Sequence, residues 1–280
     1  MKLATFERKG DRRLGAVVGK RVVDLAEAVG HPVFPATMET LVASDRGTVL
    51  EAAREALTRE DVLTFAVPAA RLQAPLLPSS IRDFGTGRTY RTVNHRSAVG
   101  PGAAIEPPPF VRELDVELKL ACVVSRWGRE LTVAEASRSI LGYTLALAWV
   151  ARDEERREMA AGGAPARARD FATSLGPVVE TVEDLPDPSS LTLSLTIDGV
   201  VRTEGDLSGL GWSFPEMLAY LSKAQDLWPG DVVMAGAVAD PCDQGRAPCL
   251  DRGAVVEGHA EGFGTLGGTV AATRPPKRFG

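Results

Sequence analysis

Residues Asp115–Val124 read DVELKLACVV, and this stretch decides the fold assignment. Its polar and apolar side chains alternate, which is typical of a β-strand whose successive side chains point to opposite faces of a sheet. The apolar side chains are therefore predicted on one face, and Asp115, Glu117 and Lys119 on the other. The pattern places a lysine two residues after a glutamate on the same face of a long strand.

Helices are predicted where a capping box precedes an apolar pattern. Thr132 with Glu135, and Ser213 with Glu216, place a hydroxyl residue three positions before a glutamate. Gly142 is predicted to end the first of these helices. The 28 glycines and 19 prolines favour turns and short strands over long helices.

Further strands are predicted on both sides of these helices. Residues 143–153 (YTLALAWVARD) are predicted as one strand, and LTLSLTIDGVV as a hairpin with Asp198-Gly199 at its turn. DVVMAGAV and GTLGGTV are predicted as the final strands. The chain beyond residue 75 therefore alternates many strands with a few helices.

Residues 1–75 are predicted as a small separate domain, and residues 76–280 as the main domain. LATF, LGAVVG and RVVDL are short strand patterns divided by charged turns. ATMETLVASDRGTVLEAAREAL has the apolar spacing of surface helices. The proline-rich segment PAARLQAPLLPSS connects this unit to the rest.

Composition predicts a soluble globular protein that resides in the cytoplasm. The 280 residues are 44% hydrophobic and 25% charged, and the net charge of −5 argues against nucleic-acid binding. No apolar run is long enough to span a bilayer, and MKLATFERKGDRR lacks the apolar core of a signal peptide. Three cysteines, Cys122, Cys242 and Cys249, do not suggest a disulfide framework, so reduced thiols are predicted. Cys242 and Cys249 would make a poor zinc site without a second pair of ligands.

From Ser80 onward the chain resembles the fumarylacetoacetate hydrolase family. The resemblance rests on ten motifs in family order: IRDF, SAVGPG, DVELKLACVV, GRELTVAEA, ILGYT, ARD, RDFATSLGP, FPEMLAYLS, LWPGDVVMAG and EGFGTLGGTV. It implies an α+β fold of layered mixed β-sheets with few short helices, preceded by a small N-terminal α/β cap domain. It also implies a homodimer.

The resemblance implies a site in which carboxylates bind Mg²⁺ or Ca²⁺ and a histidine activates water. Asp83 and Glu117 match positions of that site, but most of the others are changed. The departures are Lys119 for a second glutamate, Leu147-Ala148 for Asn-Asp, Tyr90 for the histidine, Arg169 for a lysine, Glu155 for a glutamine, and Ala237 for a threonine. We therefore expect the family's metal site to be lost and no cofactor to be bound, although residual binding at Asp83 and Glu117 stays open.

Lys119 carries the main hypothesis, that an ammonium replaces the metal. A second cation beside it would be repelled by several kcal/mol at an effective dielectric constant of about 20. Lys119 could orient a carboxylate or enolate oxygen, or form a Schiff base with a ketone. It could equally be a structural salt bridge to Glu117 or Asp83 that fills a dead site.

Other candidates surround this position. Arg152 is expected on a strand, on the same side as Ala148. It would clamp a substrate carboxylate or, as the alternative, pair with Asp153, Glu154 or Glu155. Arg169 would bind an anion. His95 could be a general base or an exposed loop residue, and Tyr90 could donate to an oxyanion. Asp83, Arg88, Glu155 and Ala237 are predicted to contact substrate, with Asp83 pairing with Arg82 or Arg88 as the alternative.

Two functions remain open from the sequence. The first is a divergent, metal-independent enzyme acting on a small oxo acid or β-dicarbonyl compound through an enolate-like intermediate. Its reaction would be C–C hydrolysis, decarboxylation, isomerisation or cyclisation. The second is a catalytically silent binding or partner subunit. The charges that persist favour the enzyme, because buried unpaired charge is costly to retain; the lost ligands and histidine favour the silent subunit.

Overall fold

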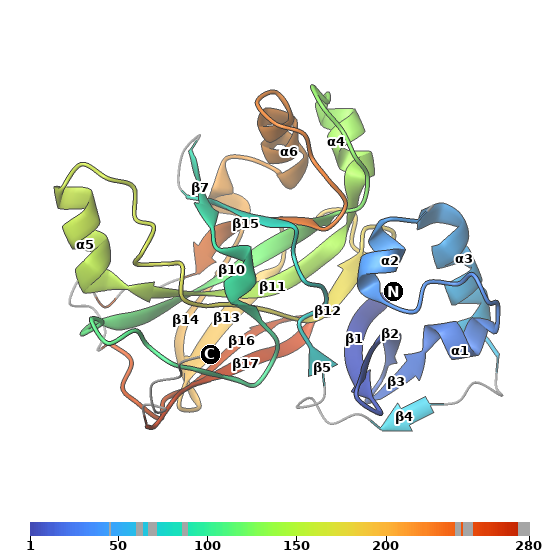
Figure 1. Ribbon diagram of the computed structural model, residues 1–280, viewed down its shortest axis with the longest axis horizontal. Coiled ribbons are helices and arrows are strands. Elements are labelled where there is room, and N and C mark those ends of the chain that lie inside the picture. Colours follow the sequence, from blue (N-terminus) through green and yellow to red (C-terminus); the bar gives the residue numbers. More distant parts are fainter. Residues whose placement is uncertain are drawn as a thin grey trace.

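The computed structural model describes residues 1–44, 46–59, 64–66, 72–85, 89–238, 242 and 249–273. Within these ranges the chain forms two β-sheets and a few short helices (Figure 1). The large sheet runs, in spatial order, β4 (Thr64–Ala66), β3 (Arg21–Asp24), β2 (Asp11–Val18), β1 (Lys2–Arg8), β12 (Thr173–Thr181), β11 (Ile140–Ala151), β10 (Leu114–Val124), β15 (Asp231–Val238), β6 (Ser80–Phe84) and β7 (Tyr90–Val93), with β5 (Leu72–Gln73) beside β1 and β8 (Ala98–Val99) beside β12.

The second sheet and the helices complete the α+β architecture that the sequence predicted. The second sheet runs β14 (Val200–Asp206), β13 (Thr192–Ile197), β16 (Val255–Ala260), β17 (Gly264–Val270) and β9 (Ala103–Ile105). The helices are α1 (Leu25–Val29), α2 (Met38–Val42), α3 (Arg46–Leu57), α4 (Val133–Ser139), α5 (Arg152–Ala160) and α6 (Phe214–Ser222), with short 3₁₀ turns η2 (His95–Ser97) and η3 (Ser208–Leu210). No helix in the described ranges is long and apolar enough to cross a membrane.

The two sheets pack face to face, and β10 shows how. Its alternate residues Val116, Leu118 and Leu120 join the core that contains residues of the second sheet. The sheets approach closely where β16 crosses β10, since a Cβ on Gly258 would lie 2.5 Å from Leu118 Cδ1. The other face of β10 therefore keeps its charged residues away from this core, as the alternating pattern predicted.

Several local predictions are confirmed. Both capping boxes form, at the starts of α4 and α6. The predicted hairpin joins β13 to β14, with Asp198 (φ 51°) and Gly199 (φ 77°) in the left-handed conformation that a tight hairpin turn requires.

Two predicted boundaries are wrong around β11. Helix α4 ends at Ser139, and Gly142 lies inside β11, where a Cβ would come within 2.2 Å of the Glu180 carbonyl oxygen. This glycine therefore permits a close strand contact and does not end a helix. The strand also stops at Ala151, and Arg152 begins α5. At 11 and 12 residues, β10 and β11 are longer than the glycine and proline content suggested.

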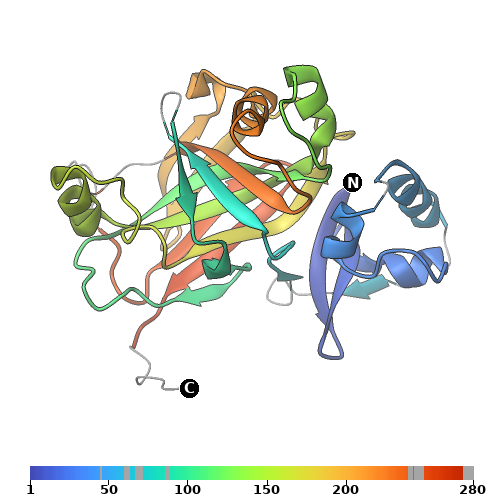
Figure 2. The same ribbon diagram turned by 45° about the horizontal axis from the view of Figure 1, so that its top comes forward.

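The N-terminal strands extend the large sheet. β1 pairs antiparallel with β12, with Lys2 opposite Glu180. Helices α1 to α3 lie beside β1–β3 at one side of the molecule in both views (Figures 1 and 2). The division near residue 75 stays a prediction, since the sheet is continuous across the two segments.

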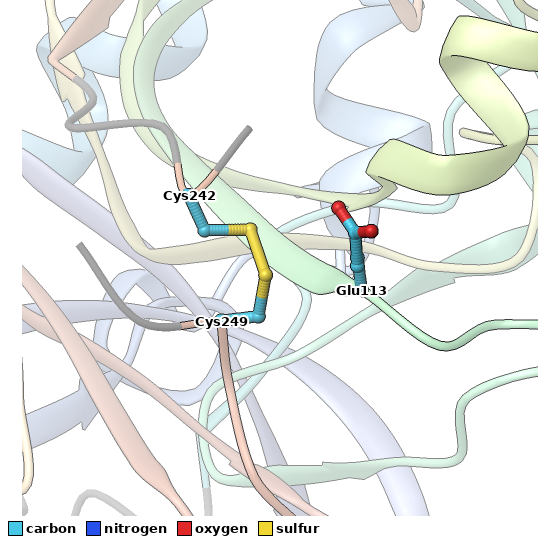
Figure 3. Close-up of side chains that lie close together, drawn as sticks. All are labelled: Glu113, Cys242 and Cys249. Atoms are coloured by element: carbon cyan, nitrogen blue, oxygen red, sulfur yellow. A yellow bond between two sulfur atoms is a disulfide. The ribbon is translucent and has the colours of Figure 1, made fainter. Parts of the chain in front are cut away.

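The predicted reduced thiols are wrong for two of the three cysteines. Cys242 and Cys249 form a disulfide, with their Cα atoms 5.1 Å apart (Figure 3). A carboxylate oxygen of Glu113 and the two sulfur atoms lie within 4.8 Å of one another. Sulfur atoms joined to each other are not thiolate ligands, so this trio is not a metal centre in the oxidised protein. Cys122 is free and buried.

Candidate active site

The charged face of β10 is buried. Asp115, Glu117 and Lys119 are 6%, 6% and 2% exposed. The neighbouring strand supplies small residues at this level, with Ala148 opposite Glu117 and Ala146 opposite Lys119. Opposite residues of an antiparallel pair point to the same face, so these alanines leave room for charged side chains.

Lys119 lies between two carboxylates, as the sequence predicted. Its Nζ donates to Asp83 Oδ1 at 2.8 Å and lies 3.2 Å from Glu117 Oε2. Asp83 reaches this position from β6, two strands away from β10 in the sheet. These contacts are typical of a lysine held as an ammonium ion and do not favour a nucleophilic neutral amine.

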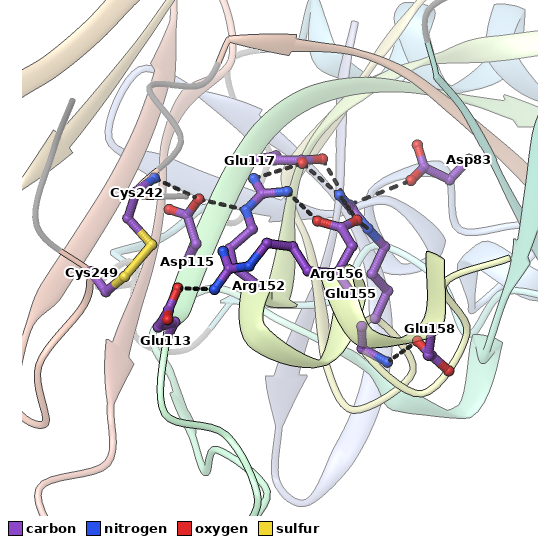
Figure 4. A network of polar contacts seen from close by, with 12 residues as sticks. Asp83, Glu113, Asp115, Glu117, Arg152, Glu155, Arg156, Glu158, Cys242 and Cys249 are labelled. Carbon is purple, nitrogen blue, oxygen red and sulfur yellow. Dashed lines mark hydrogen bonds and ion pairs between the residues drawn. A yellow bond between two sulfur atoms is a disulfide. The ribbon is translucent and has the colours of Figure 1, made fainter. Parts of the chain in front are cut away.

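Two arginines complete the contacts of Glu117. Arg169 Nη1 and Nη2 donate to its two carboxylate oxygens at 2.8 and 2.7 Å. Arg152 Nη2 donates to Oε1 at 2.8 Å, and its Nε donates to Asp115 Oδ2 at 2.8 Å (Figure 4). Both arginines also donate to Glu155, at 2.7 Å each.

Arg152 and Arg169 converge because the chain turns around β11. Arg152 is the first residue of α5, directly after β11, so its predicted place on a strand is wrong although its predicted contact with Glu155 forms. The Ala151 N–H donates to the Ala168 carbonyl oxygen at 2.9 Å, which brings Arg169 back beside the start of α5.

These contacts shift the pKa values of the buried groups. Burial raises the pKa of Glu117, but the charges of Lys119 and Arg169 outweigh it and hold the pKa well below its usual range. Burial also raises the pKa of Glu155, and Arg169 again outweighs it, so the net shift is downward. Burial lowers the pKa of Arg169, but Glu117 and Glu155 outweigh it and raise the pKa.

We call this set of residues the charge cluster. Among the described residues it contains four carboxylates, Asp83, Asp115, Glu117 and Glu155, and four cations, Arg91, Lys119, Arg152 and Arg169. The formal charges therefore cancel. Such a balance makes burial of this many ions tolerable, because each charge has a partner of opposite sign.

A cavity of about 530 Å³ opens onto the charge cluster. Its lining includes Asp83, Arg91, Glu117, Lys119 and Glu155. Tyr90 also lines it, with its ring 5.4 Å from that of Phe84. A larger cavity of about 700 Å³, near α4 and α6, contacts none of the charge cluster. The smaller cavity therefore brings a ligand into contact with the charge cluster, and the larger one does not.

Comparison with known proteins identifies the family. Residues 89–271 match the family described as fumarylacetoacetate (FAA) hydrolase C-terminal. The chain belongs to the fumarylacetoacetate hydrolase family. The mitochondrial oxaloacetate tautomerase FAHD1 of Bos taurus is 34% identical over 137 residues, which are 48% of this chain and 62% of that protein.

Solved structures share the fold of this family member. The fumarylacetoacetate hydrolase of Exiguobacterium antarcticum has a TM-score of 0.81 at 23% identity, covering 98% of this chain and 100% of that one. Maleylpyruvate hydrolase from Sphingobium sp. SYK-6, in complex with manganese(II) and pyruvate, has a TM-score of 0.76 at 23% identity, covering 97% and 99%. These likenesses confirm the predicted layered-sheet fold.

The carboxylates that a family metal would require do not fit a divalent cation as they are arranged here. Both oxygens of Glu117 accept from arginines, and Asp83 Oδ1 accepts from Lys119. The Lys119 ammonium lies between the two carboxylates, where a metal would need to contact both. Too few oxygens are left to replace the hydration shell of Mg²⁺ or Ca²⁺.

The structure does not gather all the predicted site residues. His95 lies exposed in η2 and is absent from the lining of the cavity. Arg88 lies outside the described residues, and of Ala237 only the backbone, within β15, is described. Asp83 pairs with Lys119 and not with Arg82, which donates to Gln225.

The sequence analysis missed Arg91. It lies in β7 directly opposite Asp83, and its Nε is 3.2 Å from Asp83 Oδ2. The only signal was local: IRDF followed by YRTV across a short gap is compatible with a hairpin that pairs these two positions.

Proposed function

We propose that this chain is an enzyme that catalyses keto–enol isomerisation of a small oxo acid without a divalent cation. The observation that supports the proposal most directly is the place of Lys119, between the carboxylates of Asp83 and Glu117 and on the wall of the cavity. An ammonium has three N–H donors, of which one donates to Asp83 Oδ1, while Glu117 Oε2 lies at ion-pair distance. A remaining donor can bind a substrate oxygen on which negative charge develops.

Asp83 is the base in this proposal. Its Oδ2 is buried and accepts no hydrogen bond from the described residues, although two arginines approach it. The carboxylate takes a proton from the carbon next to the ketone. The C–H electron pair forms the C=C bond, and the carbonyl π pair moves to the oxygen near Lys119. Transfer of the proton to that oxygen gives the enol and restores the Asp83 carboxylate.

Proton transfer suits this site better than hydrolysis. Hydrolysis of a C–C bond needs a water molecule activated by a base such as histidine. No histidine occurs among the described residues that line the cavity. Tyr90, at the family's histidine position, lines the cavity and can donate a hydrogen bond, but a neutral phenol is a weak base. Isomerisation requires only a carboxylate and an oxyanion donor.

The activity of one relative agrees with this choice. The bovine protein that shares 34% identity with 48% of this chain is an oxaloacetate tautomerase. A homodimer and a cytoplasmic location stay predictions.

A catalytically silent binding subunit is the second candidate. It is favoured by the hydrogen bonds within the charge cluster. Every guanidinium nitrogen of Arg152 and Arg169 donates to a carboxylate of Asp115, Glu117 or Glu155. These two arginines are then structural and do not clamp a substrate. The cavity argues for the enzyme, as does Asp83 Oδ2, which has ion-pair contacts but accepts no hydrogen bond from the described residues.

The test is the decay of enol oxaloacetate to the keto form, followed by ultraviolet absorbance with metal-free protein. We expect acceleration over buffer, no loss of rate with a chelator, and a loss of at least about 100-fold in Asp83→Asn, as is typical for removal of a general base. Elemental analysis of the purified protein accompanies the assay. A stoichiometric divalent ion bound through Glu117 would refute the metal-free site. If no small oxo acid reacts faster with the protein than in buffer, the proposed activity is refuted and the silent binding subunit is favoured.

A further inference from the structure

Arg91 differs from the other cations of the charge cluster in its exposure. Its side chain is 22% exposed, against 6% for Arg152 and Arg169 and 2% for Lys119. It lies on the short strand β7 and lines the cavity. Arg91 is therefore the cluster's cation that an incoming molecule can reach.

The contacts of Arg91 are also looser than those of its neighbours. Its Nε lies 3.2 Å from Asp83 Oδ2 without hydrogen-bond geometry, and its Nη1 lies 3.7 Å from Glu155 Oε1. The buried arginines contact their carboxylates at 2.7–2.8 Å. A guanidinium has five N–H donors, and none of those of Arg91 makes a hydrogen bond to another described residue.

The outer nitrogen of Arg91, Nη2, lies close to Gly85. No partner of Nη2 occurs among the described residues, and a Cβ built on Gly85 would lie 3.8 Å from it. Gly85 also lines the cavity and places no side chain beside the guanidinium. Arg91 thus lines the cavity with a guanidinium that makes no hydrogen bond to the described residues.

We propose that Arg91 binds the carboxylate of the substrate and so restricts the enzyme to oxo acids, excluding neutral β-dicarbonyl compounds. The inference rests on the proposed function for the position of the reacting ketone, between Asp83 and Lys119. Arginine and carboxylate form two parallel hydrogen bonds of matched geometry, which fix orientation as well as affinity. A bound carboxylate would take donors from Arg91 that now point toward Asp83, and would leave the Asp83 oxygen free to act as the base.

Binding of pyruvate and its neutral analogue methyl pyruvate tests the proposal without requiring turnover. We expect the wild-type protein to bind pyruvate more tightly than the ester, measured by ligand-observed NMR titration. Arg91→Gln should lose that preference, with about a tenfold or greater weakening for pyruvate and little change for the ester. Arg91→Lys should recover part of it, because a lysine keeps the charge but not the fork. Arg96→Gln, which removes an exposed arginine outside the cavity lining, is the matched control.

The outcomes separate this inference from the proposed function. If Arg91→Gln keeps the preference for the acid, or if the wild-type protein prefers neither probe, Arg91 is not the anchor. If the preference for the acid depends on Arg91 but no oxo acid is isomerised, the proposed role of Arg91 in carboxylate binding is supported and the proposed activity is refuted. A structural role for Arg91 would weaken binding of acid and ester alike, so the acid-to-ester ratio distinguishes the two roles.

Discussion

Replacement of Lys119 by methionine is the strongest test of the charge cluster. The change keeps an unbranched side chain, one atom shorter, and removes the ammonium that lies 2.8 Å from Asp83 and 3.2 Å from Glu117. At an effective dielectric constant of about 20, these contacts correspond to Coulomb energies of about 6 and about 5 kcal/mol. Most of that attraction offsets the cost of burying the ions, and loss of one partner of a buried pair typically costs about 3–5 kcal/mol.

We expect a loss of about 3 kcal/mol in the free energy of unfolding at pH 7, the lower end of that range. Glu117 keeps its contacts with Arg152 and Arg169, so the larger share of the loss falls on Asp83, which retains only the loose contacts of arginines. Adding Asp83→Asn should recover part of the loss, because it removes the carboxylate left without its lysine.

The loss should depend on pH with a definite sign. The pKa of Glu117 is depressed in the folded protein, so its ionisation stabilises the fold fully above its ordinary pKa of 4.5, and this stabilisation is lost as the pH falls through the folded-state pKa, well below 4.5. Lys119 contributes to that depression. The difference between wild type and Lys119→Met should therefore be larger at pH 7 than at about pH 2, where Glu117 approaches protonation in the folded protein as well.

Urea unfolding followed by circular dichroism at the two pH values gives the measurement. Lys20→Met, in the exposed turn between β2 and β3, is the control and should change stability by less than about 0.5 kcal/mol. The reasoning is refuted if Lys119→Met costs no more than this control, or if its cost is the same at both pH values.

Three further predictions follow from the same contacts. Lys119→Glu combined with Ala148→Asp should create measurable Mn²⁺ affinity by calorimetry, because Ala148 lies opposite Glu117; no gain over Ala148→Asp alone would contradict the alignment with the family site. Cys242→Ser with Cys249→Ser should lower the free energy of unfolding by about 2 kcal/mol, the loop-closure value for seven residues of separation, and an unchanged urea midpoint under oxidising conditions would contradict the disulfide. Thr132→Ala should cost about 1 kcal/mol through the lost capping box of α4, with Thr132→Ser retaining wild-type stability; equal losses in both variants would contradict the cap.

The sequence determined the features that depend on near neighbours in the chain. The two-residue period of a strand placed Glu117 and Lys119 on one face, since side chains alternate whatever the strand packs against. The capping boxes and the Asp198-Gly199 turn were readable for the same reason: each is a contact between residues at most three positions apart. The order of the family motifs predicted the layered-sheet fold, through the resemblance to the family.

Only the tertiary structure decided which distant residues meet the charged face of β10. Asp83 and Arg91 come from a strand pair at the edge of the sheet, and Arg169 returns from the loop after α5. Contacts across such separations depend on the order of the strands and on the helix that begins at Arg152, which no local pattern specifies. The Cys242–Cys249 disulfide was missed for a related reason, because a cysteine count does not give the distance between two Cα atoms. Local periodicity sets the direction in which a side chain points, and tertiary packing sets the partner that it meets.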